Sequence, residues 1–405
     1  MLLRYLKLVY DVVIVGGGAA GNAAAINIEG EVVLIERKKS IGEPVECAGL
    51  VSKRTLETLE ISLEESVQNE IYGAYIHSPK GKTVEIGGDK LHAYAIDRTK
   101  FDRILSDKAA EKGVRYILNT EVTDIKRTPE GVTVIAKDRE TSNKIEVEAN
   151  LLIGSDGAKS KVREIFFECK PSELLIGAGA EIEDVSIDPK FVHVFFGKSI
   201  APGFFAWIIP TNRKGTKARI GLCTIAPPSR PVKSLFQSLY TYPTTRPYIE
   251  DSAIIKTIGG IIPLGYMEET VKNNIMLLGD AASQVKPLSG GGIYMSLLSS
   301  KFCSQVANSA IENNRFDEGI LKGYHDLWSK EFKKEIMFGM WLRRKFVGMN
   351  DNDIEEGFKH LENEEILDVI NRYGDIDYPS RLIVPLIKKF PYMLSSLPRL
   401  LSLFL

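Results

Sequence analysis

The sequence predicts an α/β fold in which a parallel βαβ unit is followed by an antiparallel sheet and a helical C-terminal region. Residues 10–36, YDVVIVGGGAAGNAAAINIEGEVVLIE, contain two β-branched apolar runs separated by glycines and an alanine-rich segment. Between about 170 and 265, aromatic and β-branched residues alternate in stretches that Gly and Pro divide. Beyond about residue 312 the pattern is mostly helical. These patterns indicate the three kinds of structure in that order along the chain.

The remaining elements can be predicted in order along the chain. After the βαβ unit, residues 51–95 resemble short helices followed by alternating strands. Residues 97–112, DRTKFDRILSDKAAEK, have helical periodicity, and Asp97 is a suitable N-cap. Alternating segments over 114–154 predict further strands. The stretch NNIMLLGDAA at 273–282 predicts a buried parallel strand, and a helix is expected after SGGG.

Composition narrows the class of protein. The chain has 405 residues, 44% of them hydrophobic, and a formal net charge of -1, so it is long enough for two or three packed domains. This balance gives no electrostatic basis for binding nucleic acid. The N-terminus shows no signal region ending in a cleavage site, so we expect a cytoplasmic protein. The four cysteines are Cys47, Cys169, Cys223 and Cys303. They form no CxxC pair, so we expect neither a metal site nor a redox dithiol.

The first turn of the chain has the spacing of a dinucleotide site. Gly16 permits the tight turn, Gly18 lets a pyrophosphate approach the backbone, and Gly21 lets the helix pack on the strand. The helix N-terminus offers amide donors to the phosphates. Glu36 closes the second strand, where a carboxylate can accept hydrogen bonds from ribose hydroxyls. The glycines alone are weak evidence, but with strand, helix and acid in register they predict a Rossmann-type dinucleotide site.

Two further stretches identify the cofactor by resemblance. LLIGSDGAKSKVR at 151–163 and IMLLGDAA at 275–282 resemble fingerprints of the flavoprotein hydroxylase superfamily, whose type fold is that of p-hydroxybenzoate hydroxylase. The resemblance implies FAD as the cofactor. It also implies a Rossmann-type FAD-binding domain, an antiparallel-sheet substrate domain and a C-terminal helical region.

The resemblance also implies roles for single residues. Asp280 would bind the ribityl chain, Asp156 would lie near the pyrophosphate, and Arg98 would lie beside FAD. The glycine run after Ser289 opens a helix whose amides could stabilise negative charge on the N1 and C2 carbonyl side of the flavin. Alternatively, Ser289 merely caps that helix. The full set expected at FAD is Gly16, Gly18, Ala19, Ala20, Gly21, Glu36, Arg37, Cys47, Ala48, Gly49, Arg98, Val122, Asp156, Gly157, Asp280, Gly291, Gly292 and Ile293.

Three motifs narrow the resemblance to one family. PVECAG at 44–49, GFFAWIIP at 203–210 and KPLSGGGI at 286–293 are similar to motifs of the geranylgeranyl reductases, particularly the archaeal digeranylgeranylglycerophospholipid reductases. That resemblance covers nearly the whole chain and implies saturation of isolated C=C bonds in geranylgeranyl lipids. The departures are Phe205 for Tyr, Ile209 for Phe and Lys286 for Asn. The first removes a hydroxyl, so proton donation by that Tyr cannot be assumed here.

An isoprenoid substrate requires an apolar site. Each buried CH₂ contributes about 0.8 kcal/mol, so we expect aromatic side chains such as Phe195 and Phe196 to line a tunnel. Any one of them could instead belong to an ordinary sheet core. Cys47, in a turn-rich loop, is the candidate catalytic residue, acting in alkene positioning or proton delivery. The other residues expected at the substrate are Phe204, Phe205, Trp207, Pro210 and Gly290.

Two other functions remain open at this point. The strand FAWIIP also resembles the Trp-x-Trp-x-Ile-Pro strand of flavin-dependent halogenases, so a halogenase or monooxygenase of the same fold is one alternative. A non-enzymatic flavoprotein that passes electrons to a partner is the other. For the reductase, the partners would be a prenylated glycerophospholipid or geranylgeranyl substrate and an external donor, either reduced ferredoxin or NAD(P)H. We expect a monomer.

The predicted domains are discontinuous, and the tail is ambiguous. Segments 1–72, 92–169 and 266–312 are assigned to FAD, 73–91 and 170–265 to the substrate domain, and 313–405 to the helical region. The apolar tail at 381–405 is interrupted by Lys388, Lys389, Arg399 and three prolines, which argues against a spanning helix. It could lie peripherally at the inner face of the cell membrane or pack as a helical hairpin on the protein.

Overall fold

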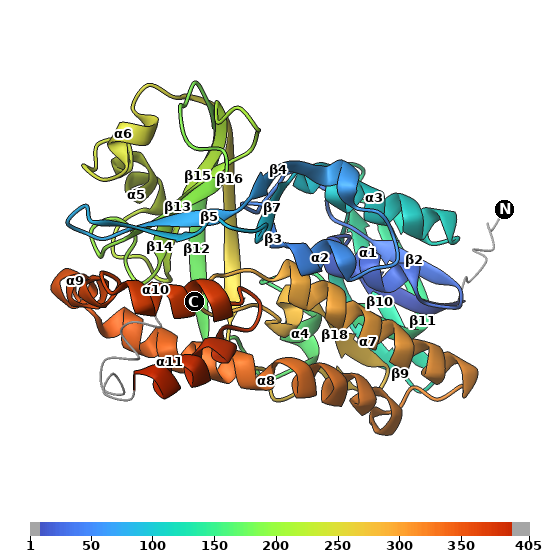
Figure 1. Ribbon diagram of the computed structural model, residues 1–405. Coiled ribbons are helices and arrows are strands. Elements are labelled where there is room, and N and C mark those ends of the chain that lie inside the picture. Colours follow the sequence, from blue (N-terminus) through green and yellow to red (C-terminus); the bar gives the residue numbers. More distant parts are fainter. Residues whose placement is uncertain (1–8, 391–405) are drawn as a thin grey trace.

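Two large sheets form the body of the molecule, and helices pack against both of them (Figure 1). The computed structural model describes residues 9–390. In the first sheet, β1, β2, β8, β11 and β18 are parallel. This eight-stranded sheet contains, in order along its main path, β17 (Val271–Lys272), β18 (Ile275–Leu277), β11 (Lys144–Gly154), β1 (Val9–Val15), β2 (Val32–Ile35) and β8 (Arg115–Ile117), together with β9 (Thr120–Thr128) and β10 (Gly131–Asp138).

The expected βαβ unit is present. Strand β1 pairs with β2 in parallel, with Val12 opposite Val32. Both strands are buried on both faces, which explains their continuous β-branched sequence. The helix between them, α1 (Ala19–Ile26), buries Ala23, Ala24 and Ala25, whose small side chains let it pack closely on its neighbours. The predicted helix after Asp97 is also confirmed, since the Asp97 carboxylate accepts a hydrogen bond from the Lys100 amide.

The second large sheet has seven strands. All its neighbours are antiparallel except β13 and β5, which are parallel. The expected antiparallel sheet is therefore confirmed, with one parallel pair that joins a hairpin from an earlier part of the chain. The strands, in order across the sheet, are β16 (Ala253–Leu264), β12 (Glu173–Glu183), β15 (Lys217–Ile225), β14 (Phe205–Pro210), β13 (Phe191–Phe196), β5 (Gly73–His77) and β6 (Thr83–Gly87).

A small third sheet lies between the two large ones in Figure 1. It consists of β3 (Leu50–Ser52), β7 (Ala93–Ile96) and β4 (Val67–Ile71). The helices besides α1 are α2 (Lys53–Glu57), α3 (Arg98–Glu111), α4 (Lys161–Phe166), α5 (Val232–Ser238), α6 (Arg246–Ile249), α7 (Ile293–Glu312), α8 (Glu318–Gly348), α9 (Asp351–His360), α10 (Glu364–Tyr373) and α11 (Ile383–Lys389), with short 3₁₀ turns η1 (Glu64–Ser66), η2 (Gly279–Ala282) and η3 (Pro379–Leu382).

The C-terminal region is helical as predicted, as far as residue 390. Helix α8 runs beneath both large sheets (Figure 1), and Phe346 near its end packs with Ile370 of α10 in one apolar cluster. Leu382 and Leu386 complete this cluster and are fully buried. The first part of the apolar tail therefore packs on the protein. Residues 391–405, on which the question of membrane contact mainly depends, lie outside the described residues.

Some features were not predicted or remain untested. Helices α5 and α6 were not predicted; they lie within the region of about 170–265 that the sequence pattern assigned to an antiparallel sheet. The division into domains remains a prediction, although β5 and β6 come from segment 73–91 and pair with the strands of 170–265. Within residues 9–390, no helix is long and apolar enough to cross a membrane. In the same range, no group of three His, Cys, Asp or Glu side chains could hold a metal ion.

Candidate functional site

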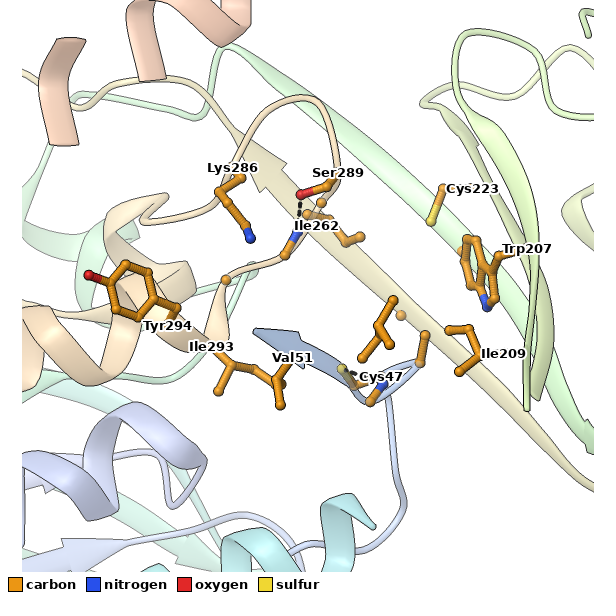
Figure 2. Close-up of a pocket in the computed structure, with 18 of the residues that line it drawn as sticks. Cys47, Val51, Trp207, Ile209, Cys223, Ile262, Lys286, Ser289, Ile293 and Tyr294 are labelled. Carbon is orange, nitrogen blue, oxygen red and sulfur yellow. Dashed lines mark hydrogen bonds between the residues drawn. The ribbon is translucent and has the colours of Figure 1, made fainter. Parts of the chain in front are cut away.

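One cavity of about 870 Å³ extends from the glycine-rich loops of the parallel sheet to the face of the seven-stranded sheet. Figure 2 shows part of its wall, with Lys286 and Tyr294 on one side, Trp207 and Ile209 on the other, and Cys47 between them. The cavity joins a polar half, built largely from backbone turns, to an apolar half, built from strand side chains.

The first glycine turn has room for no side chain at two of its three positions. Gly16 has φ +104°, and a Cβ there would lie 2.3 Å from the Ser155 carbonyl oxygen. A Cβ on Gly21 would lie 2.1 Å from the Gly16 carbonyl oxygen. Gly18 differs, because a Cβ there would meet nothing within 4 Å, and it lines the cavity. The turn is therefore closed toward the protein and open toward the cavity, as the approach of a pyrophosphate requires.

Glu36 holds the same turn from the end of β2. Its side chain is buried, its Oε2 accepts a hydrogen bond from the Gly17 amide at 2.6 Å, and its Oε1 accepts one from the Lys38 amide at 2.8 Å. Glu36 does not line the cavity itself. Its carboxylate is thus fixed beside the turn by two backbone donors, and contact with a ribose remains a prediction.

Asp156 and Gly157 form the second loop of the polar half. The Asp156 carboxylate accepts hydrogen bonds from Ser160 Oγ at 2.5 Å and from the Lys161 amide at 2.6 Å. Asp156 thus holds the start of α4, while burial raises the pKa of its carboxyl group. Gly157 has φ +82° and open space around its Cβ position. The pair therefore combines a structural cap with a glycine that leaves the cavity wall free for a ligand.

Asp280 and Arg98 place opposite charges at the cavity. Burial raises the pKa of Asp280 to about 6, while Arg98 and Arg163 act in the opposite direction. Burial also acts to lower the pKa of Arg98, but the carboxylate of Asp102 and the thiol of Cys47 raise it above its usual value. Arg98 donates to Asp102 at 2.8 Å, yet its buried Nε has no hydrogen-bond partner within residues 9–390. An unpartnered buried donor beside the cavity fits a polar ligand group.

The glycine run before α7 forms a closed turn. The Gly290 amide donates to the Lys286 carbonyl at 2.9 Å, and the Lys286 amide donates to the Gly291 carbonyl at 3.1 Å. Gly292 occupies the N-cap position of α7 without a side-chain cap, so Ser289 does not cap this helix; its Oγ accepts only from the Gly291 amide at 3.4 Å. The Lys286 ammonium donates to Asp377 at 2.9 Å. The departure from the family's Asn thus links this turn to the C-terminal region.

The apolar half follows the two-residue period of the strands. On β14, Phe205, Trp207 and Ile209 line the cavity. Trp207 also packs across β15, where a Cβ on Gly221 would lie 2.5 Å from its ring. On β13 the same alternation places two adjacent phenylalanines on opposite faces of the sheet. Phe196 lines the cavity, but Phe195 points to the other face of the sheet.

Phe195 belongs instead to a cluster behind that sheet. It is fully buried and stacks on His77 with ring centroids 4.3 Å apart. His77 Nε2 lies 3.0 Å from His193 Nδ1, and the two rings are parallel. Burial lowers the pKa of both imidazoles. The ordinary core interpretation therefore holds for Phe195, while Phe196 lies where the tunnel was expected.

Most of the predicted site residues meet at this one cavity. Pro210 does not line it: one step beyond Ile209, it turns away, and its carbonyl accepts a hydrogen bond from Asn69 Nδ2 at 3.1 Å. Val122 does not line it either and packs against the core of the first sheet. Gly16, Gly21 and Glu36 lie just behind the wall. The predicted residues on the wall are Gly18, Ala19, Ala20, Arg37, Cys47, Ala48, Gly49, Arg98, Asp156, Gly157, Phe196, Phe204, Phe205, Trp207, Asp280, Gly290, Gly291, Gly292 and Ile293.

Cys47 lies where the two halves meet. It lines the cavity, and its sulfur accepts a hydrogen bond from the Gly49 amide at 3.3 Å. Gly49 has φ +69°, a conformation that favours glycine. In Figure 2 the Cys47 sulfur lies between the loops of the polar half and the strands of the apolar half. The expected position at the substrate side of the cofactor is therefore compatible with the fold, while a catalytic role remains a prediction.

Several wall residues were missed from the sequence. Ile76 and Ile86 come from the β5–β6 hairpin, and their alternation with polar neighbours could have indicated a buried face. Ile370 and Leu382 come from the C-terminal region, where amphipathic patterns indicate burial without saying against what. A charged residue, Arg219, also lines the cavity, and no sequence signal indicated this.

Comparison with known proteins accounts for this arrangement. The family model described as FAD binding domain matches residues 9–299, which is more than half of the chain. The open glycine positions and the unpartnered Arg98 Nε fit such a group, and the cofactor is FAD. The digeranylgeranylglycerophospholipid reductase of Methanothrix thermoacetophila is 31% identical over 88% of this chain and 92% of its own. That of Methanocaldococcus jannaschii is 30% identical over 87% and 90%.

Solved structures share the fold. A geranylgeranyl bacteriochlorophyll reductase-like protein from Thermoplasma acidophilum superposes with a TM-score of 0.82 at 22% identity, covering 97% of this chain and 99% of that one. A myxobacterial chondrochloren halogenase superposes with a TM-score of 0.66 at 16% identity, covering 82% and 81%. The predicted architecture, with an FAD-binding part, an antiparallel sheet and a helical C-terminal region, is thereby confirmed.

Proposed function

Because this chain belongs to the FAD-binding family that includes the digeranylgeranylglycerophospholipid reductases, we propose that it reduces the isolated C=C bonds of geranylgeranyl chains in archaeal-type membrane lipids. One observation carries the proposal. A single cavity joins the glycine-rich loops of the parallel sheet to a wall of aromatic and aliphatic strand residues, and Cys47 stands at the junction. An FAD enzyme with a small polar substrate would not need so long an apolar wall.

The apolar wall suits a chain that binds by burial alone. A polyprenyl chain has no hydrogen-bonding groups, so its affinity depends on the CH₂ and methyl groups removed from water, each worth about 0.8 kcal/mol. Phe196 and Trp207 line this wall from two adjacent strands. Ile370 and Leu382 lie on the side that faces the C-terminal helices. Such a wall holds the chain in place while the loops fix the cofactor.

The reaction divides its tasks between cofactor and protein. The chemistry that FAD supplies when bound is a hydride for one alkene carbon. The protein must exclude water, orient the double bond and provide a proton for the other carbon. Phe205 carries no hydroxyl and cannot donate that proton. We assign alkene positioning or proton delivery to Cys47, a thiol on the cavity wall.

The remaining partners follow from this proposal. An external donor, either reduced ferredoxin or NAD(P)H, must reduce the cofactor before each turnover. Because the substrate is a membrane lipid, we propose that any membrane contact is peripheral and involves the C-terminal segment, in a monomeric protein at the inner face of the cell membrane. Lys388 and Lys389 are exposed on α11 and could face lipid headgroups.

Oxygen and product mass provide the test. The FAD-loaded protein, reduced with dithionite without oxygen, is incubated with a geranylgeranyl glycerophospholipid, and the extracted lipid is analysed by mass spectrometry. We expect products heavier by pairs of hydrogen atoms, while the same lipid with fully saturated chains, used as a control, keeps its mass. A product that requires oxygen and gains oxygen or a halogen would contradict the proposal in favour of a monooxygenase or halogenase. An unchanged lipid would favour an electron carrier.

A further inference from the structure

A buried arginine on the seven-stranded sheet reaches the loop that carries Cys47. Arg219 lies on β15 and is 2% exposed. Its Nη1 donates to the Ala48 carbonyl at 3.0 Å and to the Ile96 carbonyl at 2.8 Å. The first acceptor is the residue directly after Cys47. The guanidinium therefore ties the candidate catalytic loop to a rigid strand of the other sheet.

Other partners fix the guanidinium itself. Its Nε donates to Glu181 at 3.0 Å on the neighbouring strand β12, and its Nη2 donates to Gln68 Oε1 at 2.6 Å on β4. Hydrogen bonds that involve a charged group are stronger than neutral ones and are costly to lose when buried. With Nε, Nη1 and Nη2 all engaged, Arg219 has little freedom to rotate. Its position is therefore set by β15, β12, β4 and β7, and its bond to the Ala48 carbonyl passes that position on to the loop of Cys47.

The loop is shaped to receive this arginine. A Cβ on Gly49 would lie 2.4 Å from Arg219 Nη1 and 2.7 Å from the Ile96 carbonyl oxygen. Only glycine therefore allows the guanidinium to reach the backbone here. The Gly49 amide in turn donates to the Cys47 sulfur, and the Gly49 carbonyl accepts from the Ile96 amide at 2.8 Å. The direction of the thiol thus depends on the turn that Arg219 holds.

We propose that Arg219 is a positioning residue that sets the place of the Cys47 thiol in the cavity. It acts through the Ala48 and Ile96 carbonyls, although its side chain also borders the cavity. Its loss should loosen the 47–49 turn and misplace the thiol while the glycine loops of the polar half stay intact. The consequence for products rests on the proposed function, but the consequence for the thiol does not.

The test compares the accessibility of two cysteines in the FAD-loaded protein. Arg219→Met removes all the donors, and Arg219→Lys keeps a positive charge but cannot reach Glu181, Ala48 and Gln68 at once. Iodoacetamide labelling of Cys47, relative to the half-buried Cys169, is followed by peptide mass spectrometry. We expect Cys47 labelling about tenfold faster in both variants, equivalent to about 1.4 kcal/mol of local stability.

Lys217→Met is the matched control. Lys217 lies two residues away on the same strand and pairs with Glu183 on β12 at 3.2 Å, but it does not line the cavity. This variant should label as the unchanged protein does. Arg219→Lys should also shift lipid products toward partly reduced species at an unchanged FAD content. If the unchanged protein reduces no lipid, the proposed function fails while the labelling comparison still stands.

Two outcomes would overturn the inference. Equal Cys47 labelling in both Arg219 variants and the unchanged protein would show that the turn does not need the guanidinium. If both variants lose FAD or unfold where Lys217→Met stays intact, Arg219 is a general element of the fold. If only Arg219→Met fails to fold, the rate of Cys47 labelling in Arg219→Lys alone decides whether the inference holds.

Discussion

The two halves of the cavity differ in which atoms form their walls: backbone in the polar half and side chains in the apolar half. The polar half presents backbone: Gly18 and Gly157 leave open space, and Gly16 permits a close turn. The apolar half presents side chains, such as Phe196 and Trp207, on alternate strand positions. Backbone sites are intolerant of added atoms, whereas side-chain walls respond gradually to size and shape. The polar half should therefore fail abruptly under mutation and the apolar half by degrees.

The largest effect is expected for Gly21→Ala. Its Cβ would lie 2.1 Å from the Gly16 carbonyl oxygen and 2.5 Å from Ser155 Oγ, so the turn or the helix must move. We expect a protein that no longer retains FAD and that is destabilised by about 1–3 kcal/mol. Flavin absorbance of the purified protein and its thermal midpoint measure the two effects.

Gly18→Ala is the matched control in the same turn. Gly18 has φ −78°, and its Cβ would meet nothing within 4 Å. The FAD-free protein should keep its thermal midpoint while its affinity for FAD falls, because the methyl group lies in the open space proposed for the pyrophosphate. Equal losses of stability in the two variants would show that the turn does not distinguish protein-facing from cavity-facing glycines.

The next effect separates the two faces of the apolar sheet. Phe195→Ala should lower the free energy of unfolding by about 3–5 kcal/mol, because the fully buried ring is lost from the cluster behind the sheet. Phe205→Ala, on the cavity face, should cost less stability and should mainly weaken lipid binding. Urea unfolding and lipid titration measure these two quantities. A lipid affinity that falls equally in both variants would contradict the assignment of Phe195 to the core.

The same contrast explains which parts could be predicted from sequence. The βαβ unit lies within 10–36, so its glycines, helix and Glu36 are read in one short stretch. Cavity residues on β14 follow from local alternation, but Pro210 shows that a motif member can face away from the site it marks. Phe195 and Phe196 are adjacent, and sequence alone does not say which one faces the cavity.

Long-range placement could not be predicted. Arg219 contacts a carbonyl 171 residues earlier in the chain, and a charged residue within a strand ordinarily suggests an exposed position. Ile370 and Leu382 reach the cavity from a region that carries no family motif in this sequence. The parallel pairing of β5 with β13 brings Ile76 to the wall. These contacts depend on how the sheets and helices pack, which no local pattern records.

The smallest effect contrasts the two halves by pH. Burial raises the pKa of Asp280 in the polar half to about 6, so its contribution is present below its unfolded value of about 3.9 and is lost as the pH rises through about 6. Burial lowers the pKa of His77 and His193 behind the apolar sheet. The stability that these neutral histidines contribute is present above about pH 6.5 and is lost as the pH falls below that value.

The two contributions therefore have opposite signs, and variants should separate them. In the FAD-free protein, Asp280→Asn should remove the loss of stability between about pH 4 and 6. The double variant His77→Phe/His193→Phe should remove the loss on acidification, because no imidazole then has to stay neutral in the core. Urea midpoints measured from about pH 4 to 8 test both slopes. Stability curves parallel to that of the unchanged protein would show that neither Asp280 nor the two histidines changes stability with pH as their burial implies.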